Sequence, residues 1–359
     1  MKVALIGVGQ AGGKIAQALA EFDYNREFGA VMGAFAVNTA RADLQNLDID
    51  TMLIGQDRVK GHGVGGDNEL GAEIMQQEAT EVMDELDGRI TSKAEAIIVV
   101  AGLGGGTGSG GAPMLTRKLQ RIHDIPIYGL GVLPGRDEGA IYQANAGRSL
   151  KTFTREADSL LLIDNDAWHS SGESVEEGFD TINNRIAERV GLLLAAGEAV
   201  EGVGESVVDS SEIINTLKTG GIASLGYASA KADEDAGENI NVITSTARKA
   251  LLTGTSLPNA VQADTALLVA AGHPDRIARK GVERARKWLE EETGSLEVRG
   301  GDFPLNSENI ATLVLLGGLQ GSQRVQEFMD RASEAAKRRE QEPEDTVDDF
   351  ENEELDNLF

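Results

Sequence analysis

The sequence contains no cysteine, and only four of its 359 residues are histidine. Without cysteine the chain has no disulfide, no thiolate metal site and no thiol nucleophile. The histidines lack the paired spacing of a zinc site. Any metal chemistry must therefore use oxygen ligands, and we expect no metal site made by the protein alone.

Long apolar runs and basic residues are also scarce. No run is long enough to cross a bilayer, and the start MKVALIGVGQ has neither the length nor the cleavage site of a signal peptide. The 33 Lys and Arg face 59 Asp and Glu, for a formal net charge of −26. Such an excess of acidic residues disfavours nucleic acid and anionic lipid as partners. It is compatible with an ordinary acidic surface and also with a protein adapted to the high-salt cytoplasm of a halophilic organism. We expect a cytoplasmic protein without direct membrane insertion.

The chain alternates short apolar segments with longer amphipathic ones. In the first half, KVALIG, GAFAVN, TMLIG, AIIVVAG, IYGLGVL and SLLLID are each separated by polar or helical stretches. This pattern predicts an α/β fold, with a parallel-sheet nucleotide-binding domain over residues 1–172. Apolar residues at three- and four-residue steps predict a long central helix over 173–200. A smaller second α/β domain is expected over 201–330.

The last segment, 331–359, is rich in acid and poor in apolar residues. This composition predicts a disordered acidic tail. Its final residues, Leu355, Leu358 and Phe359, are either a short motif for a protein partner or part of a solvated end. Deleting 341–359 would separate these alternatives.

A first glycine loop, GVGQAGGK, covers residues 7–14 between a predicted strand and a predicted helix. Gly7, Gly9 and Gly12 match the dinucleotide pattern G-x-G-x-x-G, which keeps an NAD-dependent oxidoreductase open as an alternative. Against it, Asn38 stands where a ribose-binding acid is expected. The loop does not match the Walker phosphate-binding motif either, because Ile15 stands where that motif has the Ser or Thr that holds magnesium.

A second glycine loop, GLGGGTGSGG, covers residues 102–111 after the apolar run AIIVV. Because each glycine costs backbone entropy, this density indicates that a ligand approaches the main chain closely. The amides and the following helix would face an anion, and Thr107 and Ser109 add hydroxyl donors. Two such loops on neighbouring strands favour a nucleoside triphosphate.

The stretch GGGTGSG, residues 104–110, resembles the signature loop of the tubulin and FtsZ superfamily, and the chain resembles its archaeal CetZ branch over roughly residues 1–330. This resemblance implies a GTP or GDP site built from successive loops, with Mg²⁺ carried by the nucleotide. The loops NTARADL (38–44) and GHGVGGDNELG (61–71) are expected near the γ-phosphate. The phosphate-side residues implied are Gly9, Gln10, Ala11, Gly12, Gly13, Lys14, Asn38, Gly65, Gly66, Gly105, Gly106, Thr107 and Gly108.

The same resemblance implies contacts to the sugar and the base. Glu138 in LPGRDEG would bind the ribose, although it is also a plausible first-turn helix acid. Asn165 and Asn183 resemble the guanine readers, since an amide offers both a donor and an acceptor. Phe179, one turn before Asn183, would stack on the base or simply pack in the core.

No general base is evident in these loops. The resemblance implies that the water-activating acids come from the next subunit of a head-to-tail filament, and Asp209 and Glu212 occupy that stretch. The alternative is a helix cap of the form Asp-x-x-Glu. Val207 replaces an asparagine usual in bacterial relatives, which leaves a non-polymerising GTP sensor open. The implied function is a polymerisation-coupled GTPase of the cytoskeleton that controls cell shape rather than division, with motility left open as a further role.

Overall fold

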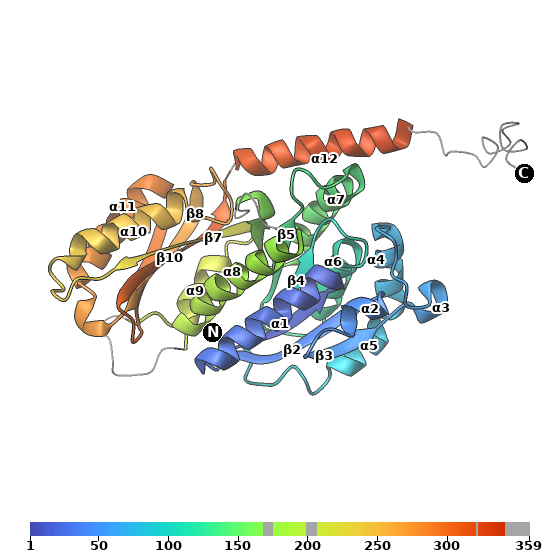
Figure 1. Cartoon of the computed structure of the whole chain (residues 1–359), viewed down its shortest axis with the longest axis horizontal. Helices are drawn as coiled ribbons and strands as arrows, with labels where there is room; N and C mark the ends of the chain where they lie inside the picture. The colour runs from blue at the N-terminus through green and yellow to red at the C-terminus, as the bar shows by residue number, and fades with distance from the viewer. Residues whose placement is uncertain (168–174, 199–206, 321, 342–359) are drawn as a thin grey trace, which may run out of the picture.

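The computed structural model of the protein describes residues 1–167, 175–198, 207–320 and 322–341 (Figure 1). Within these residues, ten strands form one sheet in the order β3-β2-β1-β4-β5-β6-β7-β10-β8-β9. The strands are β1 Val3–Val8, β2 Val31–Asn38, β3 Asp50–Leu53, β4 Ala96–Gly102, β5 Ile127–Leu133, β6 Ser159–Asp164, β7 Ile222–Lys231, β8 Ala263–Gly272, β9 Glu297–Pro304 and β10 Asn309–Leu319.

The sheet has two parts of different character. All pairings from β3 to β6 are parallel, whereas β10 runs antiparallel to both β7 and β8. Among the described strands, these two parts are paired where Leu160 and Leu161 of β6 lie beside Ile222 and Ala223 of β7. The α/β prediction is confirmed. The domain boundaries near 172 and 200 stay predictions, because 168–174 and 199–206 lie outside the described residues.

Helices cover both faces of the sheet (Figure 1). They are α1 Gly9–Arg26, α2 Arg41–Leu44, α3 Gln56–Val59, α4 Asn68–Gln77, α5 Ala79–Leu86, α6 Thr107–Leu119, α7 Ala140–Glu156, α8 Val175–Ala196, α9 Ser210–Leu217, α10 Asn239–Leu252, α11 Arg279–Thr293 and α12 Gln323–Gln341. Two short 3₁₀ turns, Asn165–Ala167 and Pro274–Arg276, follow β6 and β8.

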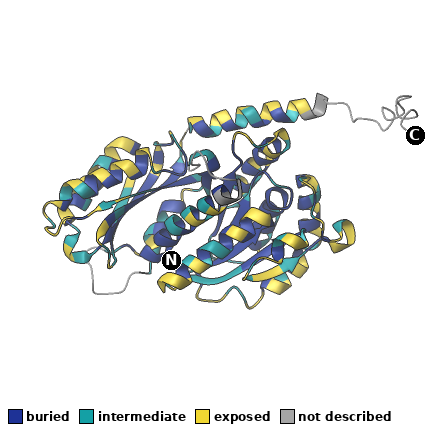
Figure 2. Cartoon of the chain, in the orientation of Figure 1, coloured by how far each residue is buried: buried dark blue, intermediate teal, exposed yellow. Residues whose placement is uncertain are grey.

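The predicted central helix is α8. Its apolar positions Ile182, Ile186, Val190 and Leu193 are all buried, and Figure 2 shows the described part of this helix mainly in the dark blue and teal of buried and half-buried residues. The side chains at these three- and four-residue steps share one face, as the sequence spacing predicts. The helix therefore packs as a core element of the fold.

The C-terminal helix α12 extends further than the sequence predicts. It continues to Gln341, past residue 331, where the disordered tail is expected to begin. Phe328, Ala332 and Ala335 are buried, and Gly147 of α7 leaves room for Ala332. This apolar stripe stabilises the helix despite its charged outer face. The prediction of a disordered tail is therefore wrong for 331–341, which are helical, and it stays a prediction for 342–359, which lie outside the described residues.

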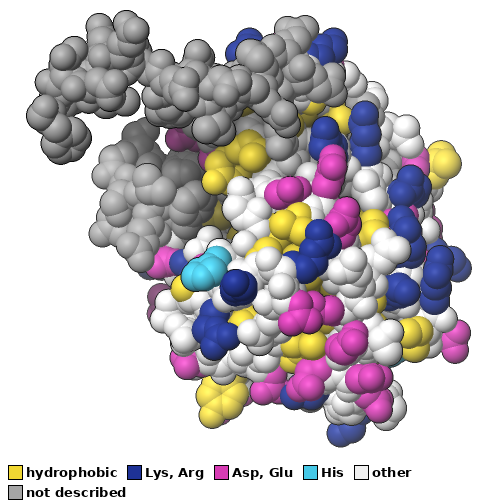
Figure 3. Space-filling view, turned by 90° about the vertical axis from the view of Figure 1, so that its right-hand side faces the viewer, with side chains coloured by type: hydrophobic (Ala, Val, Ile, Leu, Met, Phe, Trp, Pro, Cys, Tyr) yellow, Lys and Arg dark blue, Asp and Glu magenta, His cyan; other side chains and the backbone are white. Residues whose placement is uncertain are grey.

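The surface is strongly charged. On the face in Figure 3, acidic and basic side chains are interspersed, and hydrophobic ones occur in small groups between them. In the described part of the chain, no helix combines the length and apolar character needed to span a membrane.

Candidate functional site

A cavity of about 360 Å³ lies at the C-terminal ends of the parallel strands β1, β4 and β5. Ligands of open parallel sheets bind at this carboxyl edge. The lining residues are Val8, Gly9, Gln10, Ala11, Asn38, Ala40, Asp43, His62, Gly63, Val64, Gly65, Gly66, Gly102, Gly104, Gly105, Gly106, Thr107, Gly108, Val132, Leu133, Pro134, Glu138, Tyr142 and Asn165.

Both glycine loops reach this cavity, and they touch each other. Gly9 has a φ of +76°, and a Cβ built on it would lie 2.8 Å from the backbone nitrogen of Gly108. No side chain fits between loops at that distance. Helix α1 begins at Gly9 and α6 at Thr107. Two helix N-termini, with their free amides, therefore meet at one cavity and favour an anion there.

Two other glycines leave space in the cavity. A Cβ on Gly105 or Gly65 would meet no atom within 4 Å, although both residues line the cavity wall. Gly65 has a φ of +58°, a backbone conformation that by itself favours glycine. Gly105 has no positive φ and no packing neighbour at this point, so room for a ligand beside the backbone accounts for its lack of a side chain.

Gly12, Gly13 and Lys14 are not among the cavity-lining residues. A Cβ on Gly12 would lie 2.2 Å from the carbonyl oxygen of Val100, and one on Gly13 would lie 2.8 Å from Leu47. These glycines allow α1 to pack closely on the sheet, which is a structural reason for the fingerprint. Lys14 is exposed. Their contact with a nucleotide stays a prediction.

Hydrogen bonds fix the loop after β2 against α6. Asn38 donates from Nδ2 to Asp43 (2.9 Å) and accepts from the backbone of Thr39 (2.8 Å). The hydroxyls of Thr39 and Thr107 lie 2.7 Å apart in a buried contact. Asn38 and Asp43 thus present oxygen atoms next to the second glycine loop, the donor type that Mg²⁺ prefers.

Asn145 is a site residue that the sequence analysis missed. It is fully buried on α7, and its Nδ2 donates to the carbonyl oxygens of Gly66 (2.7 Å) and Gly104 (3.1 Å). One side chain therefore joins the loop 61–71 to the loop 102–111. The available signal was a polar residue among the small apolar residues of QANAG.

Glu138 and Asn165 both line the cavity. Glu138 accepts a hydrogen bond from the backbone nitrogen of Gly135 (2.7 Å), which holds its carboxylate at the start of the loop. Asn165 is only 6% exposed, and its Oδ1 has no hydrogen-bond partner among the described residues. A buried acceptor without a partner is costly, so this amide is suited to a ligand that donates a hydrogen bond.

The remaining predicted base contacts lie on α8. Asn183 is partly buried but is not a lining residue of the cavity. The backbone of Phe179 belongs to the helix, whereas its side chain lies outside the described residues. Base stacking by Phe179 and base recognition by Asn183 stay predictions.

Asp209 and Glu212 lie at the start of α9, and the capping alternative is present in the structure. Asp209 is the N-cap residue, and its Oδ1 accepts from the backbone of Glu212 (3.1 Å) and from the Ser211 hydroxyl. The Ser211 hydrogen bond lowers the pKa of Asp209. Burial raises the pKa of Glu212, whose Oε2 has no partner among the described residues. Neighbouring carboxyls with pKa values moved apart are typical of acid–base chemistry.

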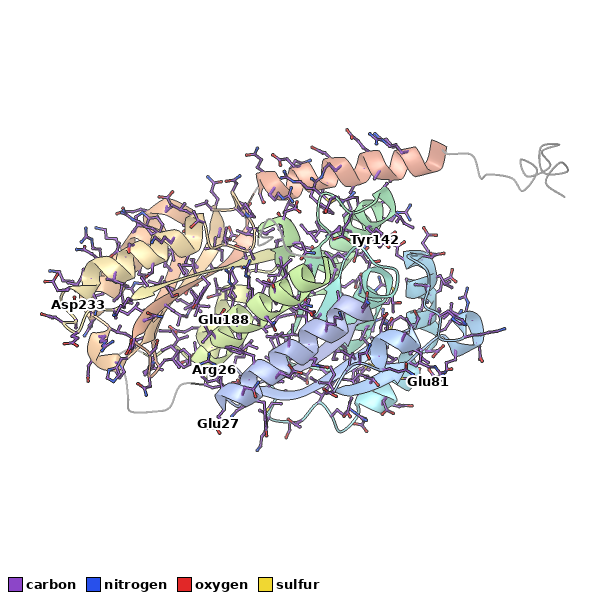
Figure 4. The ribbon with its side chains drawn as sticks, viewed as in Figure 1. Arg26, Glu27, Glu81, Tyr142, Glu188 and Asp233 are labelled. Carbon is purple, nitrogen blue, oxygen red and sulfur yellow. The ribbon has the colours of Figure 1, made fainter. Side chains whose placement is uncertain are left out.

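These two carboxyls lie at the opposite edge of the sheet from the cavity. Ser210, next to Asp209, donates to Glu95 (2.7 Å), which precedes β4, whereas the cavity follows the end of β4. A seven-residue strand spans about 23 Å. In Figure 4, the cavity residue Tyr142 lies far from Arg26 and Glu27, which mark the C-terminal end of α1, on the side of the sheet where β1 begins. The carboxyls cannot reach a ligand in the cavity of the same chain.

The buried position of Glu212 predicts that Glu212→Gln raises the melting temperature at neutral pH, on the order of 1 °C. Because burial raises the pKa of Glu212, the ionised side chain disfavours folding above that pKa. This cost disappears below the pKa of an unfolded glutamate, so the variant's advantage should vanish toward about pH 4. Thermal unfolding monitored by circular dichroism over this pH range measures it.

Glu81→Gln is the matched control. Glu81 is an exposed glutamate in the first turn of α5, labelled in Figure 4. Its substitution removes a first-turn charge without relieving burial, so it should not stabilise the protein. Equal effects of the two substitutions would contradict the argument from burial.

Comparisons with known proteins match both parts of the chain. Residues 2–173 match the model of the Tubulin/FtsZ family, GTPase domain, and residues 172–334 match Tubulin-like CetZ, C-terminal domain. Tubulin-like protein CetZ2 of Haloferax volcanii is 65% identical over 360 residues, which cover 100% of both chains. The chain belongs to the CetZ family of tubulin-like proteins. The predicted family is confirmed, and the oxidoreductase alternative is set aside.

Solved structures of the CetZ family share the architecture. CetZ2 from Haloferax volcanii, a GTPgS bound protofilament, superposes with a TM-score of 0.92 over 95% of this chain and 100% of that one. CetZ1 from the same organism, a GDP bound monomer, is 50% identical with a TM-score of 0.87, over 94% of this chain and 100% of that one. An FtsZ dimer from M. jannaschii is 20% identical and shares the fold (TM-score 0.73), over 90% of this chain and 88% of that one.

Proposed function

We propose that this CetZ-family protein binds GTP in the cavity and hydrolyses it at the interface between subunits of a head-to-tail filament. The observation that supports this most is the separation of the site into two halves. The glycine loops lie at one edge of the sheet, and Asp209 and Glu212 lie at the other. A second copy stacked in the same orientation would bring its carboxyls to the first copy's cavity.

The cavity supplies groups of the kind that a nucleotide requires. Backbone amides at the starts of α1 and α6 would bind the phosphates, with Gly105 and Gly65 leaving room for the oxygens. Glu138 would accept from the ribose hydroxyls, and the free acceptor of Asn165 would meet the donor edge of guanine. Asn38 and Asp43 would help to hold Mg²⁺, which neutralises phosphate charge when bound.

Hydrolysis would be completed by the neighbouring subunit. Its Asp209, held ionised by the hydrogen bond from Ser211, would accept a hydrogen bond from the attacking water and orient it toward the γ-phosphate. Its Glu212, whose pKa is raised by burial, would sit beside that water to exchange a proton. Turnover then requires assembly.

A second candidate, a GTP sensor that does not polymerise, is favoured by one observation. Val207 stands two residues before Asp209, where the resemblance to bacterial relatives implies an asparagine, and it forms a β-bridge with Asp302.

We further infer a cytoplasmic location, a role in cell shape and a protein partner for the acidic residues 342–359.

Hydrolysis per subunit against protein concentration tests the proposal. We would record light scattering in the same samples, with magnesium and molar KCl because the chain carries a net charge of −26. A rate per subunit that rises with concentration and scattering supports the shared site. A concentration-independent rate without sedimentable polymer favours a single-chain site, and GTP binding without hydrolysis or polymer favours the sensor.

Asn145→Leu is expected to raise KM for GTP about tenfold, because two loop carbonyls lose their buried donor. The effect should appear as weaker binding of GDP to the unassembled protein. Asn241→Leu, on the exposed face of α10, is the matched control and should bind as the parent does. Unchanged binding in the Asn145 variant would show that the two loops hold their positions without it.

A further inference from the structure

Arg324 forms a buried ion pair between the C-terminal helix α12 and strand β6, in the parallel part of the sheet. It lies near the start of α12 and is 4% exposed, and its partner Asp164 at the end of β6 is 1% exposed. Its Nε and Nη2 both donate to the Asp164 carboxylate, and Nη2 also lies 2.7 Å from Asp166. The fork of an arginine suits such a bidentate contact.

The two carboxylates that Arg324 binds stand on either side of Asn165. Asp164 accepts from the backbone nitrogen of Asp166 (3.2 Å), which closes the turn that carries Asn165. Asp166 in turn accepts from the backbone of Arg136 (3.1 Å) and pairs with its guanidinium (3.2 Å). Arg136 belongs to the loop that carries Glu138. One guanidinium on α12 is therefore linked to both cavity-lining loops.

We propose that Arg324 is a positioning residue that sets Asn165 and Glu138 for nucleotide recognition, so that α12 forms part of the recognition apparatus. The proposal rests on the proposed function, because it assumes that these two residues meet a base and a ribose. Arg324 itself does not line the cavity. It acts through Asp164 and Asp166.

Energetics support a positioning role over a purely stabilising one. Removing two charges from water costs so much that a buried ion pair often stabilises a fold less than apolar side chains of similar volume would. A buried pair is also little screened by salt, so the geometry would persist in a high-salt cytoplasm. The hydrogen bonds of Arg324 to Asp164 and Asp166 thus fix the orientation of the turn that carries Asn165. Apolar side chains in the same place would fill the space without fixing that orientation.

The test is the nucleotide preference of Arg324→Met. Binding of fluorescent GDP and ADP would be measured on full-length protein, below the assembly concentration and in molar KCl. We expect GDP affinity to fall about tenfold, with a clear drop in the ratio of GDP to ADP affinity, because Asn165 loses its orientation. Arg324→Lys keeps the charge but not the fork and should recover the ratio in part.

Arg117→Met is the matched control, since Arg117 pairs with Glu156 between α6 and α7 and does not line the cavity. It should keep the parent's ratio. Asp166→Asn provides a milder variant in case Arg324→Met does not fold, because Asp166 is partly exposed and the change keeps its shape.

The outcomes are distinct. A reduced GDP-to-ADP ratio in folded Arg324→Met, or in Asp166→Asn, supports the positioning role. A folded Arg324→Met variant with the parent's ratio overturns it. If Arg324→Met does not fold, the full parent's ratio in Arg324→Lys, which lacks the two-pronged contact to Asp164, overturns it. A parent protein that does not prefer GDP over ADP would instead contradict the proposed guanine site.

Discussion

Asp209→Ala is expected to bind GTP as the parent protein does and to lose nearly all hydrolysis. Binding should be unchanged, because Asp209 does not line the cavity and lies at the other edge of the sheet. Removing a group that activates water costs about 10²–10⁴-fold in rate. Equilibrium binding of labelled GTP and phosphate release at a concentration that supports assembly measure the two quantities.

Asp209→Asn separates catalysis from helix capping. Asp209 is the N-cap of α9, and loss of a cap costs about 1 kcal/mol of stability. Asparagine caps a helix as well as aspartate does but carries no charge. If the carboxylate is catalytic, both variants lose hydrolysis. Parent-like turnover in Asp209→Asn would show that only the cap matters and would contradict the assigned role.

Gly105→Val is expected to abolish nucleotide binding while leaving the fold intact. A Cβ on Gly105 meets no atom within 4 Å, and this residue lines the cavity wall. The added side chain therefore enters the space assigned to the phosphates rather than the packed core. We expect affinity to fall by more than about 100-fold, because a steric clash and lost amide contacts act together.

Gly237→Val is the control for Gly105→Val. Gly237 lies in the exposed turn between β7 and α10, where a Cβ meets only the Asp235 side chain, within 4 Å. Thermal unfolding should show both variants folded, and titration with labelled GDP should show binding in the control alone. Normal GDP affinity in Gly105→Val would mean that the phosphates lie elsewhere.

Local sequence patterns predicted the strands, the long helix and the cavity loops well. Apolar runs that alternate with helical spacing specify a covered parallel sheet, and glycine-rich turns after strands specify a ligand edge. The ambiguous patterns were those in which one residue type has two physical uses. Gly12 fits a phosphate loop and also fits close packing against Val100, and Asp209 caps a helix whether or not it is catalytic.

Contacts between distant segments were beyond the sequence. Arg324 and Asp164 are 160 residues apart, and Asn145 reaches two loops that precede it by many residues. Neither of these contacts produces a recognisable sequence motif, because each depends on how α7 or α12 packs against the rest of the fold. The extension of α12 likewise depends on the burial of Phe328 and Ala332 against the rest of the protein. Tertiary packing outweighed the polar composition there.

The most direct test of the shared site is to mix two variants that are each expected to be inactive alone. Asp209→Ala keeps the cavity but lacks the carboxylate, and Gly105→Val keeps the carboxylate but lacks the cavity. If each active site combines two subunits, the mixture should release phosphate well above the sum of the separate rates, with a maximum at intermediate ratios. If both variants enter wild-type filaments and no mixture recovers hydrolysis, the site is not shared between subunits.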